Sequence, residues 1–465
     1  MKNLIYANEP FFIKNRRYTN RDIDAFAFEY MNFIEKAKTE RLSVLEIEKA
    51  VLSNGYEKID LYSDVKKLPR KFYIKFFNKN IAVVNLKNSI ESGINFIISH
   101  IDSPHIDLKQ NPFADMSDIL MLKTHYYGGI KKYQWMNIPL SLNGIIITRS
   151  GKTVNIDIGN NEGDPVLVIP DIAPHLSKRI QDPKTIKEAV NAESLNAIAG
   201  TVYDKKYSKD KHRIKMFAMN ILNKKYGIKE EDFLTAELQL TPALKPRFSG
   251  FDESLIAGYG HDDRACSFTS LKAAIDVDMK KVSKSCATIF YDKEETGSDG
   301  PTGAQSLFIE DLINFILETE KKNARNSDYR KIFLKSNAIS ADVNSAINPN
   351  FPEVFEPLNC SKFGYGAVLT KFTGHGGKSS TNDANAEYIS RLTRLFERDK
   401  ICWQIGSFSK VDEGGGGTIA RHISKYGCNV VDCGPSVMSM HSPYELVSKH
   451  DLFGVYLAYK TFFTY

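Results

Sequence analysis

Helical and strand-like patterns alternate along the chain after Gly258, and this alternation restricts the possible folds more than any other feature. Helices are expected at 265–277, 303–320, 385–396 and 442–463, and strands at 286–291, 338–343, 367–372 and 429–433. Strands that alternate with helices are typical of a mostly parallel sheet with helices on both faces. The sequence therefore predicts an α/β fold, a three-layer α/β/α sandwich around a mostly parallel central sheet.

The first hundred residues carry the same kinds of pattern. Apolar residues at helical spacing predict a helix over 20–40 with Asn20 as its N-cap, and a second helix is expected to begin at Ser43. Strands are expected at 72–77, 81–85 and 94–99. The last of these, INFIIS, is apolar throughout, as expected of a strand that is buried on both faces. It places His100 at its C-terminal end.

The pattern changes between residues 107 and 251. Short β-like runs at 144–148, 153–158 and 166–169 are separated by turn residues. Because α/β patterns both precede and follow this segment, we interpret it as an inserted β-rich domain. The predicted boundaries are 1–106 and 252–465 for the two parts of the α/β domain and 107–251 for the insertion.

Composition and charge are those of an ordinary globular protein. The 465 residues are 42% hydrophobic and 25% charged, which excludes a collagen-like or wholly disordered chain. Lys and Arg exceed Asp and Glu by 62 to 56, and the surplus is spread out. The most basic stretch, 204–215, lacks interleaved aromatic residues, so we interpret it as a solvated loop and expect no nucleic-acid partner.

Cysteine usage and the N-terminus predict a cytoplasmic protein. The six cysteines form no C-x-x-C pair, so free thiols in a reducing compartment are expected rather than a zinc knuckle. The first residues lack the apolar core and cleavage site of a signal peptide. No uninterrupted apolar run approaches the ~20 residues of a membrane span, so no membrane partner is expected.

Five polar clusters lie just beyond apolar strand-like runs. They are HIDSP (100–104), GHDDR (260–264), DKEETGS (292–298), SAD (340–342) and MHSP (440–443). Each alone has a common structural explanation, such as a local salt bridge or a solvated helix face. In open α/β sheets, however, ligands bind beyond the carboxyl ends of the strands, and so many carboxylates together favour a divalent cation. Mixed His and carboxylate ligands suit zinc, and also manganese or cobalt.

The adjacent pair Glu294-Glu295 suggests a division of labour. At a junction between a strand and a loop, the two side chains can diverge around one site. One carboxylate could then bind metal while the other takes a proton from water, as metal-assisted hydrolysis requires.

The order of these motifs resembles peptidase family M18, the aspartyl aminopeptidase and aminopeptidase I group. The matching motifs are HxDSP, DDR, DxEExGS, SxD and MHS. Further matches are YGGIKKYQW (127–135), IPDIAPHL (169–176), GHGGKSSTNDANAE (374–387) and the stretch 414–418. The resemblance extends over nearly the whole chain.

The resemblance implies two Zn²⁺ ions per subunit, with Mn²⁺ or Co²⁺ as possible substitutes. Asp262 resembles the carboxylate that bridges the metals, and it is preferred to Asp263 because the first acidic residue of such a pair bridges in similar enzymes. The remaining implied ligands are His100 and Asp342 for one metal, and Glu295 and His441 for the other. Glu294 resembles the general base, and Asp102 is placed to accept the second ring N–H of His100.

The activity implied by the resemblance is removal of acidic or neutral N-terminal residues from peptides by a metal-activated water. The inserted domain is implied to form dimers, which assemble into a dodecamer. Lys371 resembles a lysine that meets an acidic substrate side chain, and His175 lies in a stretch that reaches a neighbouring subunit's active site in some members. A plain surface lysine and an ordinary polar contact are the competing interpretations.

The chain departs from the family motifs at a few positions, and alternative functions stay open at this point. Ser345 stands where the family often has a histidine, and His261 with Asp263-Arg264 places the chain nearer the aminopeptidase I branch. One alternative is another dinuclear metallohydrolase, a carboxypeptidase or amidohydrolase. The other is a non-catalytic oligomeric shell, although every implied ligand and the base are present. No HExxH motif occurs, and Phe372 replaces the first glycine that a phosphate-binding loop ending at 377–379 would need.

Overall fold

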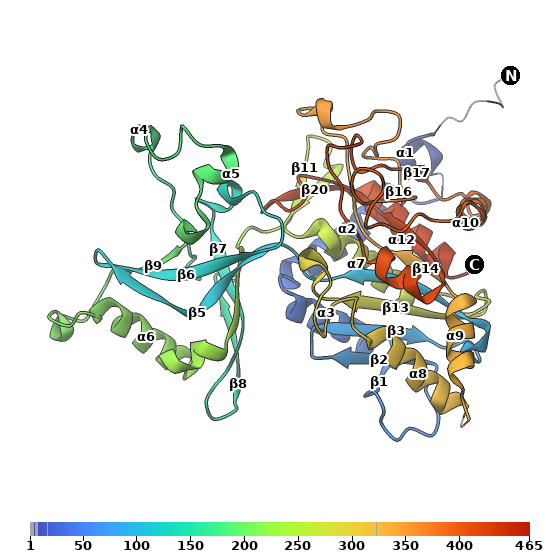
Figure 1. Ribbon diagram of the computed structural model, residues 1–465, viewed down its shortest axis with the longest axis horizontal. Coiled ribbons are helices and arrows are strands. Elements are labelled where there is room, and N and C mark those ends of the chain that lie inside the picture. Colours follow the sequence, from blue (N-terminus) through green and yellow to red (C-terminus); the bar gives the residue numbers. More distant parts are fainter. Residues whose placement is uncertain (1–3, 5–7, 16, 322) are drawn as a thin grey trace. The chain divides into compact units, whose positions relative to one another are not determined.

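The computed structural model describes residues 1–465 except 1–3, 5–7, 16 and 322 (Figure 1). The chain divides into two compact units, the first made of Met1–Asp102, Pro246–Met440 and Glu445–Tyr465, and the second of Ser103–Lys245 and His441–Tyr444. The second unit differs from the predicted insertion, 107–251, by a few residues at each end. It also contains 441–444, a segment that the sequence analysis assigned to the C-terminal part of the α/β domain.

A nine-stranded sheet forms the centre of the first unit. Its order is β1 (Glu57–Lys58), β2 (Lys71–Phe76), β3 (Asn80–Asn85), β13 (Ser285–Tyr291), β4 (Ile94–His100), β14 (Asn337–Ser340), β18 (Asn429–Gly434), β16 (Ala367–Thr370), β17 (Trp403–Ile405). The four central strands, from β13 to β18, pair in parallel. Antiparallel pairs join β2 to β3, β3 to β13 and β16 to β18. The carboxyl ends of the central strands therefore meet at one edge of the sheet.

Helices pack against this sheet and form two hydrophobic cores with it. The first core takes residues from α2 (Asn20–Lys36), α3 (Glu40–Ser53), α7 (His261–Ile275), α10 (Ala386–Arg398) and α12 (Lys449–Phe462). The second takes residues from α8 (Phe308–Glu320), α9 (Asn326–Leu334) and α11 (Ala420–Ile423). Along β4, Ile97 packs into the first core, whereas Phe96 and Ile98 pack into the second. This is the alternation of a strand buried on both faces, as predicted for residues 94–99.

Threonines rather than the predicted residues begin the first two long helices. The Thr19 hydroxyl accepts from the backbone N–H of Asp22 at 3.3 Å, and the Asp22 carboxylate accepts from the backbone N–H of Thr19 at 2.8 Å. This reciprocal box makes Thr19 the N-cap of α2, so the prediction of Asn20 was wrong. Thr39 likewise caps α3, which begins before the predicted Ser43.

An antiparallel six-stranded sheet forms the second unit. Its order is β8 (Thr153–Ile158), β7 (Leu140–Ile147), β10 (Glu237–Pro242), β5 (His105–Met116), β6 (Ile119–Tyr127), β9 (Ala197–Gly200). The predicted strand at 166–169 makes only isolated bridges, between Leu167 and Leu140 and between Val168 and Ile198. The basic stretch 204–215 is not entirely a loop, because α6 (Arg213–Tyr226) begins within it and buries Ile214.

A five-stranded sheet in the first unit corrects the predicted C-terminal helix. Its order is β11 (Arg247–Ser249), β12 (Leu255–Gly258), β20 (Glu445–Ser448), β19 (Ser436–Met438), β15 (Asn344–Ser345). The predicted helix over 442–463 therefore starts only after β20. Its N-cap is Ser448, whose hydroxyl accepts from the backbone N–H of Asp451 at 3.3 Å.

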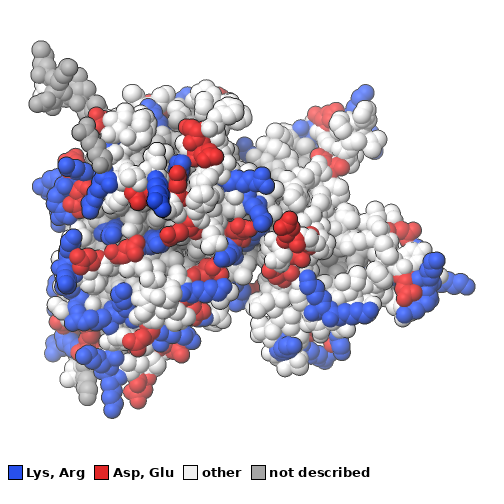
Figure 2. Space-filling model, turned by 180° about the vertical axis from the view of Figure 1, so that it is seen from behind, with Lys and Arg blue, Asp and Glu red and all other residues white. Residues whose placement is uncertain are grey.

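The surface and the helices give two further observations. Figure 2 shows Lys and Arg side chains interspersed with Asp and Glu over the visible face, in keeping with a positive surplus that is spread out. Among the described residues, none of the helices combines the length and the apolar character that a membrane span needs.

Candidate metal centre

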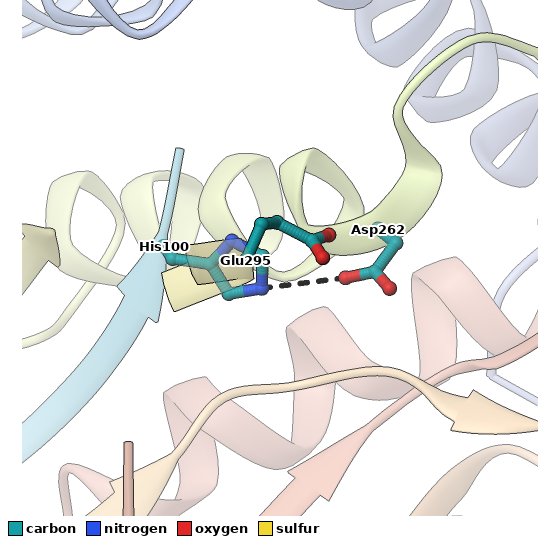
Figure 3. A group of neighbouring side chains, drawn as sticks. All are labelled: His100, Asp262 and Glu295. Atoms are coloured by element: carbon teal, nitrogen blue, oxygen red, sulfur yellow. Dashed lines mark ion pairs between the residues drawn. The ribbon is translucent and has the colours of Figure 1, made fainter. Parts of the chain in front are cut away.

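Polar side chains from several sequence segments meet beyond the carboxyl ends of the central strands. His100 ends β4, Glu295 lies in a short turn after β13, and Asp262 lies at the start of α7 (Figure 3). Within the described part of the chain, potential ligand atoms of these three residues lie within 4.8 Å of one another. Asp262, Asp263 and Asp342 form a second such group. Asp262 belongs to both.

His100 is buried and surrounded by carboxylates. Its Nδ1 lies 3.1 Å from the carbonyl oxygen of Asp102 and 3.3 Å from the Asp102 carboxylate, while its Nε2 lies 3.3 Å from Oδ1 of Asp262. Burial alone would lower the pKa of His100, but the carboxylates of Asp102 and Asp262 outweigh it and raise the pKa well above its ordinary value. The site therefore has a negative potential that favours a cation.

The Asp102 carboxylate contacts more groups in this site than the sequence analysis predicted. Its carboxylate is buried, and besides lying next to the His100 ring it accepts two backbone hydrogen bonds. Oδ1 accepts from the N–H of Glu294 at 3.2 Å, and Oδ2 accepts from the N–H of Glu295 at 3.1 Å. One side chain thus fixes the position of the histidine and of the turn that carries both glutamates. The prediction included only its contact with His100.

Asp263 is a member of the cluster that sequence reasoning set aside in favour of Asp262. The peptide bond between the two residues is cis. Oδ2 of Asp263 accepts from the backbone N–H of His100 at 3.3 Å, and its Oδ1 is buried without a hydrogen-bond partner among the described residues. Burial raises the pKa of Asp263 well above its ordinary value. Its position next to Asp262 was the only sequence feature that pointed to Asp263 as a potential ligand.

Glu445 is another contributor that no motif identified. It lies in β20 and is buried, and its Oε2 accepts from the backbone N–H of Asp262 at 3.1 Å. This hydrogen bond fixes the backbone at the residue shared by the two ligand groups. Contact between segments 183 positions apart cannot be read from local patterns.

The donor set fits a divalent metal. It combines an imidazole nitrogen with carboxylate oxygens, the ligand types that zinc takes in proteins. Burial raises the pKa of Asp342, as it does that of Asp263, because charged carboxylates so close together are costly to desolvate. A bound cation removes that cost, since it pairs with the carboxylates that burial otherwise disfavours.

His441 lies in the second unit, so its role as a metal ligand stays a prediction. Its Nδ1 lies 2.8 Å from the carbonyl oxygen of Gly129. A carbonyl oxygen only accepts hydrogen bonds, so Nδ1 carries the ring proton and Nε2 has the lone pair. This is the tautomer that a ligand binding through Nε2 requires.

The two predicted substrate-binding residues are both exposed. Lys371 follows β16 and forms an ion pair with Asp383, which also pairs with Lys378 at 2.9 Å. Its charge is thus already balanced within the chain. His175 lies on α4 (Pro174–Ser177) of the second unit. The substrate contacts of Lys371 and His175 stay predictions.

A pocket of about 240 Å³ opens beside the cluster. Glu294 and Glu295 contribute to one wall, and the other lining residues include Ser298, Thr418, Arg421 and His422. The last two were missed by sequence reasoning, which singled out only the glycine stretch before them. Glu294 is 16% exposed, and its Oε2 lies 4.0 Å from Nε2 of His100. It is therefore placed to exchange a proton with a molecule in the pocket.

Comparisons with known proteins agree with this geometry. The sequence profile of the family described as aminopeptidase I zinc metalloprotease (M18) matches residues 33–463. A probable M18 family aminopeptidase 1 of Borreliella afzelii is 42% identical over 443 residues, 94% of this chain and 95% of that protein. The crystal structure of an M18 aminopeptidase from Thermotoga maritima superposes with a TM-score of 0.93 at 39% identity over 99% of both chains. That of aminopeptidase I from Clostridium acetobutylicum has a TM-score of 0.91 at 37% identity, over 98% of this chain and 99% of that one.

Proposed function

Because this chain belongs to the M18 family of zinc metalloaminopeptidases, we propose that it removes N-terminal residues from peptides with two zinc ions per subunit. The residues proposed to hold them are His100, Asp262, Asp342, Glu295 and His441. The observation that carries the proposal is that Asp262 belongs to both potential ligand groups. A carboxylate shared in this way is suited to bridging two ions, and manganese or cobalt would suit the same donors.

Glu294 is proposed as the general base. Zinc, when bound, polarises the scissile carbonyl and lowers the pKa of water at the site. Glu294 takes the proton of that water and passes it to the leaving nitrogen. The hydrogen bond from its backbone N–H to Asp102 keeps the residue beside the ligand groups. Glu294 lies in the same unit as both ligand groups and lines the pocket beside them, but it belongs to neither group.

Exopeptidase action requires recognition of the substrate's free α-ammonium group. The several carboxylates of this centre supply acceptors for it, and an N-acetylated peptide has no such charge. We therefore expect the zinc-, manganese- or cobalt-supplemented protein to release N-terminal Asp, Glu, Leu or Lys from peptides with a free amine and to leave N-acetylated counterparts intact. Chromatography of the products gives both the rate and the preferred first residue.

The same assay separates the alternatives. Equal hydrolysis of blocked peptides would indicate an amidohydrolase, and release of C-terminal residues would indicate a carboxypeptidase. No hydrolysis with any of the three metals would indicate a non-catalytic shell.

The ligand role of His441 has a separate test. His441→Ala is expected to lower the metal-to-protein ratio to about half, because the metal it binds would lose one of its few protein ligands. Elemental analysis of the purified protein measures this ratio. His125→Ala is the matched control, since His125 also places Nδ1 against a backbone carbonyl, that of Tyr126 at 2.8 Å, but is not a proposed ligand. A full ratio in the His441 variant would remove this residue from the ligand set.

The architecture is proposed to serve assembly as well as catalysis. The first unit would be a three-layer α/β/α catalytic domain, and the β-rich unit would form dimers that build a dodecamer. The structure of mApe1 from S. cerevisiae, which superposes with a TM-score of 0.76 at 21% identity, is a dodecamer. In such an assembly, the exposed His175 would meet a neighbouring subunit, and Lys371 would contact an acidic first residue.

A further inference from the structure

The pocket beside Glu294 has walls of opposite charge. Glu294 and Glu295 form the acidic wall, next to the ligand groups. Arg421 and His422, on α11 (Ala420–Ile423), also line the pocket, and Arg421 brings a positive charge to it. A pocket of about 240 Å³ is large enough for one amino-acid residue rather than for a long peptide segment.

His422 presents a buried hydrogen-bond donor. Nε of Arg421 donates to Nε2 of His422 at 3.0 Å, so Nε2 is the accepting nitrogen and Nδ1 carries the proton. His422 is 5% exposed, and its Nδ1 is buried without a hydrogen-bond partner among the described residues. Burial, with Arg421 as a second cause, lowers the pKa of His422 to about 4, so the ring stays neutral at neutral pH. A buried N–H without a partner is costly unless a ligand accepts from it.

Arg421 supplies a positive charge at the same place. In the part of the chain that the structure describes, no carboxylate forms an ion pair with it, in contrast to Lys371 and its partner Asp383. Gly417 leaves room for its guanidinium group. A Cβ atom at Gly417 would lie 3.1 Å from NH1 of Arg421 and 2.9 Å from the carbonyl oxygen of Ser380. The glycine stretch that the sequence analysis singled out thus shapes this wall.

We propose that Arg421 and His422 bind a carboxylate on the residue that follows the scissile bond. It would be either the acidic side chain of that residue or, in a dipeptide, its terminal carboxylate. Both groups of the pair are donors, and a carboxylate can accept from a guanidinium and from an imidazole N–H together. The assignment to the leaving side rests on the proposed function, in which Glu294 gives its proton to the leaving nitrogen. The leaving residue then lies beside the wall that Glu294 forms.

The test compares four substrates on the zinc-loaded full chain. They are Leu-Ala-amide, Leu-Asp-amide, the dipeptide Leu-Ala and Asp-Ala-amide. Arg421→Ala is expected to lower kcat/KM for Leu-Asp-amide, for Leu-Ala, or for both, by about 10- to 100-fold more than for Leu-Ala-amide. Which of the two responds identifies the source of the carboxylate. Arg421→Lys should recover part of the loss, since it keeps the charge but not the forked donor geometry.

Lys425→Ala is the matched control. Lys425 is exposed in the same segment and adds to the positive field at His422, but it does not line the pocket. Its removal should leave the ratio of the four kcat/KM values unchanged within about twofold. Loss confined to Asp-Ala-amide in the Arg421 variant would place the first residue here and overturn the proposal. Equal loss for all four substrates would also overturn it.

A binding measurement keeps this inference separate from the proposed function. Calorimetric titration of the Glu294→Gln protein with Leu-Asp-amide, with Leu-Ala and with Leu-Ala-amide requires no turnover. The carboxylate site would be supported if Leu-Asp-amide or Leu-Ala bound more tightly than Leu-Ala-amide and if this difference disappeared when Arg421→Ala was added. This holds even for a protein that hydrolyses none of these peptides. Equal binding of all three would overturn it, whereas failure of the unaltered protein to cleave Leu-Ala-amide would count against the proposed aminopeptidase activity alone.

Discussion

Glu294→Gln is expected to lower kcat by about 10²- to 10⁴-fold while the chain keeps its full complement of zinc. The amide has nearly the same shape as the carboxylate but cannot take a proton from water. Neither potential ligand group includes Glu294, and its backbone N–H, which Asp102 holds, is unchanged by the substitution. Peptide hydrolysis and elemental analysis on the same preparation measure the two quantities.

Glu397→Gln is the matched control for this result. Glu397 lies exposed on α10, and the same loss of one negative charge there should change kcat by less than about twofold. If Glu294→Gln kept normal turnover, another group would have to be the base. If it lost zinc together with activity, Glu294 would be a ligand rather than the base.

The elements of the α/β unit could be predicted from sequence because their patterns are local. Residues 94–99 were expected to form a buried strand, and β4 covers Ile94–His100. The errors arose where particular hydrogen-bond partners, near or distant in the chain, decide the boundary. Asp22 makes Thr19 rather than Asn20 the N-cap of α2, and the pairing of β20 with β12 and β19 removes the first turns of the predicted C-terminal helix. Propensity alone does not contain these partners.

The candidate site was predictable only to the extent that its residues occur in ordered motifs. The structure brings His100, Asp262, Glu295 and Asp342 into two overlapping groups, as their positions at strand ends led us to expect. The pocket could not be predicted, because the segments 294–298 and 417–422 meet only through the fold. The acceptor on Glu445 and the donor on His422 could not be predicted either, because neither residue belongs to a motif with a known role.

The tripeptide His-Ile-Asp occurs twice, at 100–102 and at 105–107, and the sequence of the tripeptide does not say which copy builds the site. In the first copy, Asp102 is buried and serves the ring of His100 and the backbone N–H groups of both glutamates. In the second copy, Asp107 is 40% exposed on its side chain and lies 3.0 Å from Nε2 of His105, whose ring stacks on Tyr127. The residues that follow distinguish the two copies, since Ser103-Pro104 completes HxDSP only after the first, and the fold explains the difference in function.

Asp102→Asn is therefore expected to lower kcat/KM and to weaken zinc binding, each by about 10- to 100-fold. An amide has one accepting oxygen, so its NH₂ group would face a backbone N–H of the glutamate turn or Nδ1 of His100, all of which donate. A buried donor left without an acceptor costs about 1–3 kcal/mol, and the turn that carries Glu294 and Glu295 would shift to relieve it. Zinc titration with a competing chelator and steady-state kinetics measure the two effects.

Asp107→Asn changes the same atom in the second copy and should alter either quantity by no more than about twofold. Asp107 has a single ring nitrogen to satisfy, and an asparagine can present either its oxygen or its NH₂ group to it. The contrast between the two variants isolates the effect of position from that of the tripeptide. Comparable losses in both would mean that Asp102 does not act through the glutamate turn. Loss of zinc binding with normal turnover at saturating zinc, in Asp102→Asn alone, would restrict its role to orienting His100.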